Sequence, residues 1–490
     1  MTMERREFLK FAGLVAAGAT LSACTPAYRM ISDSAESPAS WLDGDTRAFR
    51  ILNRLCYGPT LTERQRAAAI GVPAWIEEQL DPASLPDLSG ELAVRPLTSL
   101  GLDAADLAAW ERDDVLAELK RGTLLRRIYS RRQLQEMLVE FWTDHFNISV
   151  EKGACWFLKT IDDRQVIRRH ALGNFRDLLW ASSHSPAMLV YLDNQVNDRR
   201  APNENYAREL LELHTLGVDG GYAQADVMEM ARCLTGWTVK DRFWRGQFAF
   251  RSGMHDEGTK HVLGVRIEPA GQREAESVIE RLAANPATAR HLARKMMRRF
   301  LDPGLVGAPD LEGRAASAFQ ASGGEIEAML RVILFDGVAA APDPSPKFKR
   351  PVNFVTSSLR MLGTTTNGGR PVLDHLARMG QPLFEWPTPD GPPDEMAPWQ
   401  GGLFARWAFA YDLARNEMDG TQIHLKDLLR VAGAESLEGA FDALANLLLG
   451  APLPEPARSE VLRGIGKGPE DEGPAFLLAG LLASPAFQWH

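Results

Sequence analysis

The clearest alternation of apolar and polar positions lies between Asn203 and Trp237, and it predicts two helices joined by a glycine-rich turn. In the first helix, apolar side chains recur with the 3.6-residue period and polar side chains share the opposite face. The apolar face comprises Tyr206, Ala207, Leu210, Leu211, Leu213 and His214, and the polar face comprises Glu204, Asn205, Arg208, Glu209 and Glu212. Gly217 is expected to end this helix, and residues 219–221 supply a turn. A second amphipathic helix then turns Val227, Met230, Ala231 and Leu234 inward.

Helical periodicity recurs along most of the chain. It predicts helices over about 47–57, 61–80, 103–130, 133–147, 157–180, 273–284, 287–300, 325–335, 351–362, 372–379, 404–415, 438–449 and 474–483. Asn285 and Pro286 predict the N-cap and first turn of the helix over 287–300. The period changes only over 243–267, where spaced Phe, Val and Ile residues predict a hairpin turning at Gly253 to Thr259. We therefore predict a mainly α protein, a large multi-helix globular body with one small β-hairpin near 245–267.

The N-terminus predicts three segments: a signal peptide over 1–23, a flexible tether over 24–45 and a single α-helical domain over 46–490. Glu4-Arg5-Arg6-Glu7-Phe8-Leu9-Lys10 resembles a twin-arginine export signal, and a short apolar run follows it. Leu21-Ser22-Ala23-Cys24 resembles a lipoprotein cleavage box, in which Cys24 would be diacylated. The alternative is a conventional secretory signal with an accidental arginine pair. The first interpretation places the protein in the cell envelope, lipid-anchored, in the periplasm or at the outer membrane.

Charge and cysteine content narrow the possible ligands. The formal net charge is −9, which argues against a phosphate-backbone partner, so we expect no nucleic acid. Beyond Cys24, three widely spaced cysteines remain, with no metal-ligand spacing. We expect Cys56, Cys155 and Cys233 to be buried thiols, with one disulfide as the alternative. The chain also carries no nucleophile elbow, zincin motif, phosphate loop or dinucleotide fingerprint.

A polar collar around the start of the first signature helix is the first candidate site. It comprises Asp193, Asn194, Asn197, Asn203, Glu204, Asn205, Arg208 and Glu209. Clustered carboxylate and amide oxygens suit a divalent cation or sugar hydroxyls, and paired carboxylates suit acid–base hydrolysis. The competing interpretation is an ion-pair network that fixes the helix against its neighbours.

His145 is the second candidate, within Phe141-Trp142-Thr143-Asp144-His145-Phe146. It falls on the apolar stripe of its helix, so a hydrogen-bonded core histidine competes with a proton-shuttling role. Asp144 is expected to point elsewhere on that helix. The loop over 381–402 carries Trp386 and Trp399 among prolines and glycines and is long enough to frame a site.

Two further charged groups favour solvated structure over a site. The segment over 255–261 holds two histidines and two carboxylates, but its spacing matches no zinc rule, so a solvated turn is expected. Arg294, Lys295, Arg298 and Arg299 give the helix over 287–300 a basic face, which we interpret as its solvated side rather than an anion site.

Several of these motifs resemble one bacterial family, catalogued as domain of unknown function 1800. They are the string over 203–237, the Arg54-x-x-Tyr57-Gly58-Pro59-Thr60 run, the Phe141-Trp142-x-x-His145-Phe146 motif and the loop from Gln381 to Gly391. The resemblance implies that position 214 accepts His or Phe, which favours packing there. It also implies a co-exported partner resembling the sulfatase/alkaline-phosphatase superfamily.

Two hypotheses follow. In the first, the chain is an exported lipoprotein that assembles or binds in the envelope beside that partner. In the second, it is a metal- or carboxylate-dependent hydrolase of an envelope glycan or polymer. Its site would then join Glu204, Glu209 and Arg208 to His145 under the Trp386 and Trp399 loop, with a divalent metal as possible cofactor.

Overall fold

The protein is described by a computed structural model. It describes residues 46–240, 245–301, 309–340, 346–453 and 473–490, together with 455, 458, 459, 462 and 463. The expected signal peptide, the tether and Cys24 lie outside these residues.

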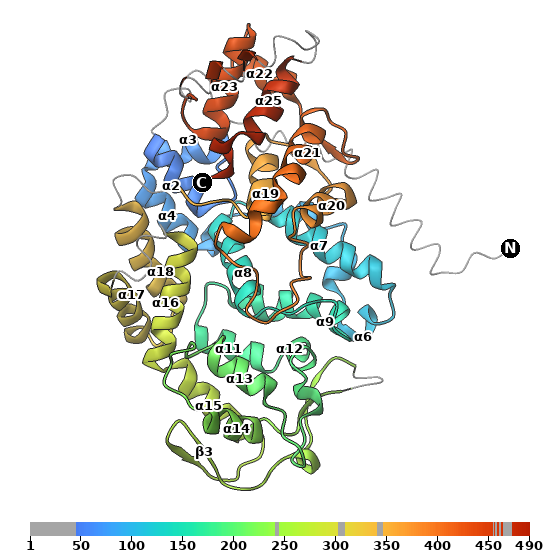
Figure 1. The fold of residues 1–490 in the computed structure, drawn as a ribbon, viewed down its shortest axis with the longest axis vertical. Coiled ribbons are helices and arrows are strands. Elements are labelled where there is room, and N and C mark those ends of the chain that lie inside the picture. Colours follow the sequence, from blue (N-terminus) through green and yellow to red (C-terminus); the bar gives the residue numbers. More distant parts are fainter. Residues whose placement is uncertain are drawn as a thin grey trace, which may run out of the picture.

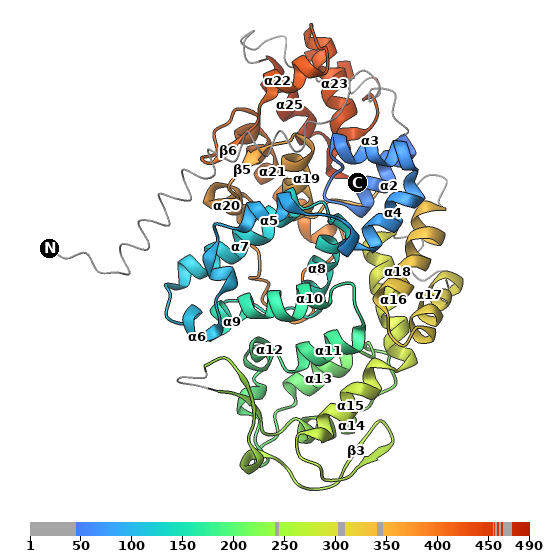
Figure 2. The ribbon, with the colours of Figure 1, turned by 180° about the vertical axis from the view of Figure 1, so that it is seen from behind.

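Helices make up most of the described chain, as predicted (Figures 1 and 2). In the first part they are α2 (Thr46–Leu55), α3 (Leu61–Ile70), α4 (Val72–Leu80), α5 (Leu88–Val94), α6 (Ala104–Leu107), α7 (Arg112–Tyr129), α8 (Gln133–His145), α9 (Cys155–Asp162), α10 (Arg168–His170), α11 (Phe175–Ser183), α12 (Pro186–Tyr191), α13 (Glu204–Glu212) and α14 (Gln224–Cys233). Then follow α15 (Arg273–Ala283), α16 (Pro286–Phe300), α17 (Pro309–Ala321), α18 (Ile326–Arg331), α19 (Pro351–Met361), α20 (Arg370–Arg378), α21 (Leu403–Ala414), α22 (Leu425–Val431), α23 (Leu437–Leu449) and α25 (Gly473–Ala483).

The first described helix and the C-terminus lie in the same half of the body (Figures 1 and 2). Figures 1 and 2 show the C-terminal helices α21 to α25 beside α2 and α3, and the segment from α11 to α15 at the opposite end. Helix α16 runs along one side between them, with α17 and α18 outside it. Two large apolar clusters form the core. One is built mainly on α2 to α4 and α8 to α18, the other mainly on α7 and α19 to α25, and Trp156 packs against both.

The strands differ from the single hairpin that the sequence predicted. In the described residues, β1 (Trp237–Val239) pairs with β2 (Phe248–Phe250), β3 (Lys260–Val262) with β4 (Val265–Ile267), and β5 (Thr365–Thr366) with β6 (Thr421–Gln422), all antiparallel. The expected turn at Gly253 to Thr259 is wrong. The β3–β4 hairpin turns at Leu263 and Gly264, which have φ of 50° and 73°. Apolar spacing marked the extended segments, but the choice of strand partner depends on contacts across the fold.

Local sequence signals set the ends of the helices around the site. The Asn285 side chain accepts a hydrogen bond from the Ala287 N–H, and Pro286 occupies the first turn of α16, as predicted.

Among the described residues no helix is both long and apolar enough to cross a membrane. Cys56, Cys155 and Cys233 are buried free thiols, which confirms that expectation and excludes the alternative of a disulfide between them in this structure.

Candidate functional site

A cavity of about 510 Å³ opens between the C-terminal end of α8, the turn after α13, helix α16 and the loop after α20. Its charged lining comes from all of these elements. The titratable lining residues are Asp144, His145, Asp219, Arg290, His291, Arg294, Lys295, Arg298, Arg299, Arg350, Asp390, Asp394 and Glu395. A concave site at which polar groups from separate segments converge is a candidate small-molecule site.

The centre of the cavity is a hydrogen bond between His145 and Lys295. His145 Nε2 lies 3.1 Å from the His214 carbonyl oxygen, so Nε2 must carry the proton and donate it. The other ring nitrogen, Nδ1, is then an acceptor, and Lys295 Nζ donates to it at 2.9 Å. His145 is therefore a neutral imidazole that presents its lone pair to a lysine in the cavity.

Burial shifts the proton affinities of this pair downwards. Burial, reinforced by Lys295 and His214, holds the pKa of His145 well below its ordinary value. Burial also lowers the pKa of Lys295 to about 8, with Arg298 acting in the same direction and Asp144, Asp390 and Asp394 opposing it. Lys295 therefore changes charge close to neutral pH, which is a property of functional sites.

Asp144 and Glu140, which lie on α8 with His145, form ion pairs with two buried arginines. Arg350 donates to Asp144 at 2.7 Å and also to Glu140, which accepts from Arg299 at 3.3 Å. Burial raises the pKa of Asp144 to about 7, against the opposite effect of Arg299. The expectation that Asp144 would point away from this region is wrong, because Asp144 and His145 line the same cavity.

The loop after α20 covers the C-terminal end of α8, as expected of a segment that frames a site. Asn147 donates to the carbonyl oxygens of Trp386 and Thr388 at 3.0 and 2.7 Å. Gly391 has a φ of 77°, and a Cβ there would overlap the Asp144 carbonyl oxygen, so this close approach requires glycine. The loop is thereby held against the end of α8, where its residues 390–395 line the cavity.

Asp394 fastens the loop to the opposite side of the cavity. Its carboxylate accepts from Lys347 at 2.6 Å and lies 3.8 Å from Arg299. Although burial acts to raise it, Lys347 and the two arginines Arg299 and Arg350 hold the pKa of Asp394 well below its usual range. Asp394 therefore remains ionised in the site.

The two tryptophans of the loop brace it from within. Trp399 is buried and its Nε1 donates to the Pro393 carbonyl oxygen at 3.1 Å, while Trp386 donates to Thr388 Oγ1 at 3.1 Å. The ring centroids of the two tryptophans are 5.9 Å apart. Neither residue lines the cavity, so in this structure they hold the loop in shape.

The polar collar lies outside the cavity and ties segments of the body together. Asn194 donates to the carbonyl oxygens of Leu234 and Trp237 at 3.3 and 3.0 Å. Asn203 caps α13 by accepting from the Asn205 N–H. Asp193 pairs with Lys152 at 2.7 Å. These contacts hold the loop before α13 against its neighbours, which is a structural role.

The three charged residues proposed from α13 are similarly placed. Glu204 and Arg208 form an ion pair at 3.0 Å, with side chains 36% and 40% exposed. Burial and the neighbouring Glu212 raise the pKa of Glu209, which is half-buried. None of the three lines the cavity that contains His145, so the structure does not bring the expected acid–base set together.

The basic face of α16, which the sequence led us to interpret as solvated, lines the cavity instead. Lys295 and Arg299 turn into the cavity rather than into solvent, whereas Arg294 and Arg298 lie at its exposed edge. A signal was present, since His291, Lys295 and Arg299 repeat at four-residue spacing beside the apolar stripe of the helix.

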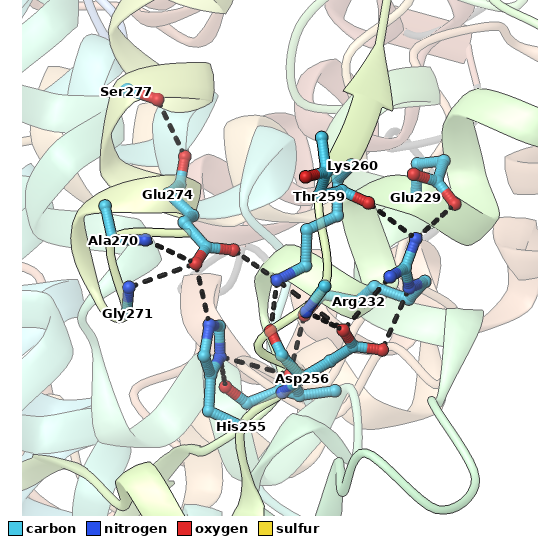
Figure 3. Close-up of polar contacts among 12 residues, drawn as sticks. Glu229, Arg232, His255, Asp256, Thr259, Lys260, Ala270, Gly271, Glu274 and Ser277 are labelled. Carbon is cyan, nitrogen blue, oxygen red and sulfur yellow. Dashed lines mark hydrogen bonds and ion pairs between the residues drawn. The ribbon is translucent and has the colours of Figure 1, made fainter. Parts of the chain in front are cut away.

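The segment over 255–261 is also corrected in part, because His255 and Lys260 are buried (Figure 3). Figure 3 shows Glu274 between His255 and Lys260. The Glu274 carboxylate lies 3.1 Å from His255 Nε2 and 2.5 Å from Lys260 Nζ. Arg232 donates to Asp256 at 2.9 and 3.0 Å. The group joins the β3–β4 hairpin to α14 and α15. The expected solvated turn is therefore wrong for His255 and Lys260, whereas Glu257 and His261 are exposed as expected.

No group of three or more His, Cys, Asp and Glu side chains suited to a metal ion occurs within the described residues. Two histidines that line the cavity use their ring nitrogens in hydrogen bonds to protein groups. His145 Nε2 donates to the His214 carbonyl oxygen and its Nδ1 accepts from Lys295, and His291 Nε2 lies 3.1 Å from the Leu213 carbonyl oxygen. These hydrogen bonds orient the rings of His145 and His291.

Fold and site together define a mainly α protein with a cavity lined by charged residues of α8, α16 and the loop after α20. The match to known families extends over residues 50–489, and the chain belongs to the family described as Protein of unknown function (DUF1800). No curated protein matches the chain, and no solved structure matches it.

Proposed function

We propose that the cavity binds an anionic group, such as a phosphate, sulfate or carboxylate, carried by a component of the cell envelope. The observation that carries this proposal is the 2.9 Å hydrogen bond from Lys295 to the neutral His145 inside the cavity. An incoming anion would accept from the same ammonium group, and the imidazole would hold Lys295 in place and take or return a proton.

The basic wall of the cavity supports an anionic ligand. Helix α16 contributes five cationic residues to the lining and no carboxylate. Three of them are already paired: Arg294 with Glu312 at 2.9 Å, Arg299 with Glu140 at 3.3 Å and Arg298 with Glu395 at 3.8 Å. Among the contacts of the described residues, the Lys295 ammonium donates only to the neutral ring of His145. Lys295 is therefore the group best placed to bind an anion.

Catalysis at the same pair is the second candidate. A lysine whose pKa is about 8 can act as a general acid or base near neutral pH. This favours a hydrolase of an envelope polymer in which Lys295 and His145 move the proton. Glu204 and Glu209 would then take no part in a reaction at this pair, since they lie outside the cavity.

Lys295→Met is expected to weaken binding of inorganic phosphate or sulfate by roughly tenfold to a hundredfold, because a charge-assisted hydrogen bond is lost. Titration calorimetry measures the change. Lys426→Met, an exposed lysine on α22, is the matched control and should bind as the parent does. Equal binding by the parent and Lys295→Met would contradict the proposal.

The same titration has a defined pH dependence. The pKa of Lys295 in the free protein is about 8, so its charge is present below that pH and lost above it. Anion affinity of the parent should therefore fall as pH rises from about 7 to about 9. Lys295→Met should show a flatter profile over the same range.

We further propose that the protein is a lipid-anchored envelope protein, exported folded and working beside a co-exported partner. The arginine pair and the sequence around Cys24 support the location, and the family resemblance supports the partner. Arg5→Lys with Arg6→Lys should leave the protein in the cytoplasm. Cys24→Ala should release it from membranes washed at high pH, which removes peripheral proteins. Unchanged fractionation of both variants would contradict the location.

A further inference from the structure

Helix α21 presents an exposed aromatic stripe at the end of the body that also holds α2, the first described helix, and the C-terminus. Leu403, Phe404, Trp407 and Tyr411 are 41%, 81%, 47% and 41% exposed. Their spacing places them on one face of the helix over two turns. Other large exposed apolar residues of the described chain, such as Val218 and Met228, lie on other elements.

The opposite face of α21 is fully used by the core. Arg406, Phe409, Ala410 and Leu413 are buried, and the Arg406 guanidinium lies 5.0 Å from the Phe354 ring centroid. The helix holds one other charged residue, Asp412, which lies 3.1 Å from His375. The stripe is therefore an outward apolar face, and α21 itself places no unpaired charge beside it. Such a charge would oppose burial of the stripe in an apolar environment.

The composition of the stripe favours a membrane interface over a dry protein surface. Phe404 and Trp407 pack edge to face with ring centroids 5.4 Å apart, and Tyr411 continues the row. Tryptophan and tyrosine combine an apolar ring with a polar edge, and they are enriched where lipid head groups meet the acyl region.

The position of the stripe agrees with the anchor. The fold begins at Thr46 in α2, whose hydroxyl lies 3.4 Å from the carbonyl oxygen of Gly450 at the end of α23. Figures 1 and 2 show α2, α23, α25 and α21 in the same end of the body. A lipid on Cys24 would be joined to this end by residues 25–45, which reach roughly 70 Å when extended.

We infer that the α21 stripe docks on the surface of a lipid bilayer, with Phe404 and Trp407 inserted between head groups. The inference rests in part on the proposed lipid anchor, which would hold the stripe near the membrane. A diacylated Cys24 would attach the chain stably but leave the body free to turn on its tether, so a second apolar contact at the stripe would orient the body. The cavity between α8 and α16 is then held at a fixed height above the bilayer.

The test compares full-length Cys24→Ala protein with the same protein carrying Phe404→Ser and Trp407→Ser, using vesicles of phosphatidylethanolamine and phosphatidylglycerol. Both proteins keep the leader and lack the lipid, so their difference reports only the stripe. Sedimentation with vesicles should fall roughly tenfold or more, since two large apolar side chains no longer insert. Cys24→Ala with Met228→Ser, an exposed apolar residue of α14, is the matched control and should sediment like Cys24→Ala alone.

Three results would overturn the inference. The first is no vesicle binding by the Cys24→Ala protein. The second is equal binding by the two proteins, as expected if the leader alone binds or covers the stripe. The third is a change from dimer to monomer in the Phe404→Ser/Trp407→Ser protein without loss of vesicle binding, which would make the stripe a contact between copies. Phosphate binding at Lys295 should be unchanged in every variant, so a failure of the docking inference is distinct from a failure of the proposed function.

Discussion

Glu140→Gln is expected to lower the free energy of unfolding by about 3–5 kcal/mol, because two buried guanidinium groups lose the charge that balances them. Glu140 is buried on α8 and accepts from Arg299, Arg350 and the Tyr57 hydroxyl. Glutamine keeps the size of the side chain but removes the negative charge. Asp144 and Asp394 also contact these arginines, so we expect the lower part of the range.

The matched control for this prediction is the same substitution at Glu204. Its ion pair with Arg208 is partly exposed, and such pairs contribute less than about 1 kcal/mol. Urea unfolding of Glu140→Gln and Glu204→Gln beside the parent measures both effects. Similar losses in the two variants would show that burial of the Glu140 network does not govern its contribution.

Glu274→Gln is expected to lower the free energy of unfolding by about 3 kcal/mol. Lys260 and Glu274 are both 0% exposed and form an ion pair at 2.5 Å. Glu274 also accepts from the backbone N–H groups of Ala270 and Gly271 at 2.8 and 3.0 Å. The substitution removes the nearest counter-ion of a buried ammonium, leaving only Asp256 at 3.8 Å, and weakens the bonds that join the hairpin to α15.

The effect of Glu274 has a defined pH dependence. Burial acts to raise the pKa of Glu274, but Lys260 and the backbone donors lower it below the ordinary value of 4.5. A carboxyl group with a depressed pKa stabilises the folded state above its unfolded pKa and loses that contribution as pH falls through its folded pKa. The difference between parent and Glu274→Gln should therefore be full at pH about 6 and shrink below pH about 4.

A double-mutant cycle separates the ion pair from its surroundings. Lys260→Met should restore part of the stability lost by Glu274→Gln, since no buried ammonium then remains unpaired. Glu268→Gln is the matched control, because its pair with Arg266 lies on the same hairpin with both side chains largely exposed. A Glu268→Gln loss as large as that of Glu274→Gln, or strict additivity in the cycle, would contradict the prediction.

Helical periodicity was a reliable guide to the elements that carry the cavity. The apolar stripe of α8, the cap of α16 and the polar and apolar faces of α13 all follow from residues within one or two turns of each other. These signals are local, so the sequence contains them completely. The same reasoning identified His145 and the loop over 381–402 as parts of a site, and both border the cavity.

The polar residues were harder to place, because a charge on a helix face has the same local pattern whether it meets solvent or a partner. Glu204 and Arg208 formed the more conspicuous cluster, yet they pair with each other at the surface. Lys295 looked like part of a solvated face, yet it donates to His145, 150 positions away in the chain. His255 and Lys260 looked like turn residues, yet the Glu274 carboxylate of α15 contacts both side chains.

The sequence by itself determined the mainly α class, the family and the faces of the helices, since each depends on short-range periodicity and motifs. Tertiary structure alone decided which faces meet. It placed Lys295 against His145, joined Arg350 to Asp144 across 206 positions and paired β1 with β2. The physical reason is that burial and partner choice arise from contacts between distant segments. Burial then lowers the pKa of Lys295 to about 8, a property that no local pattern of residues encodes.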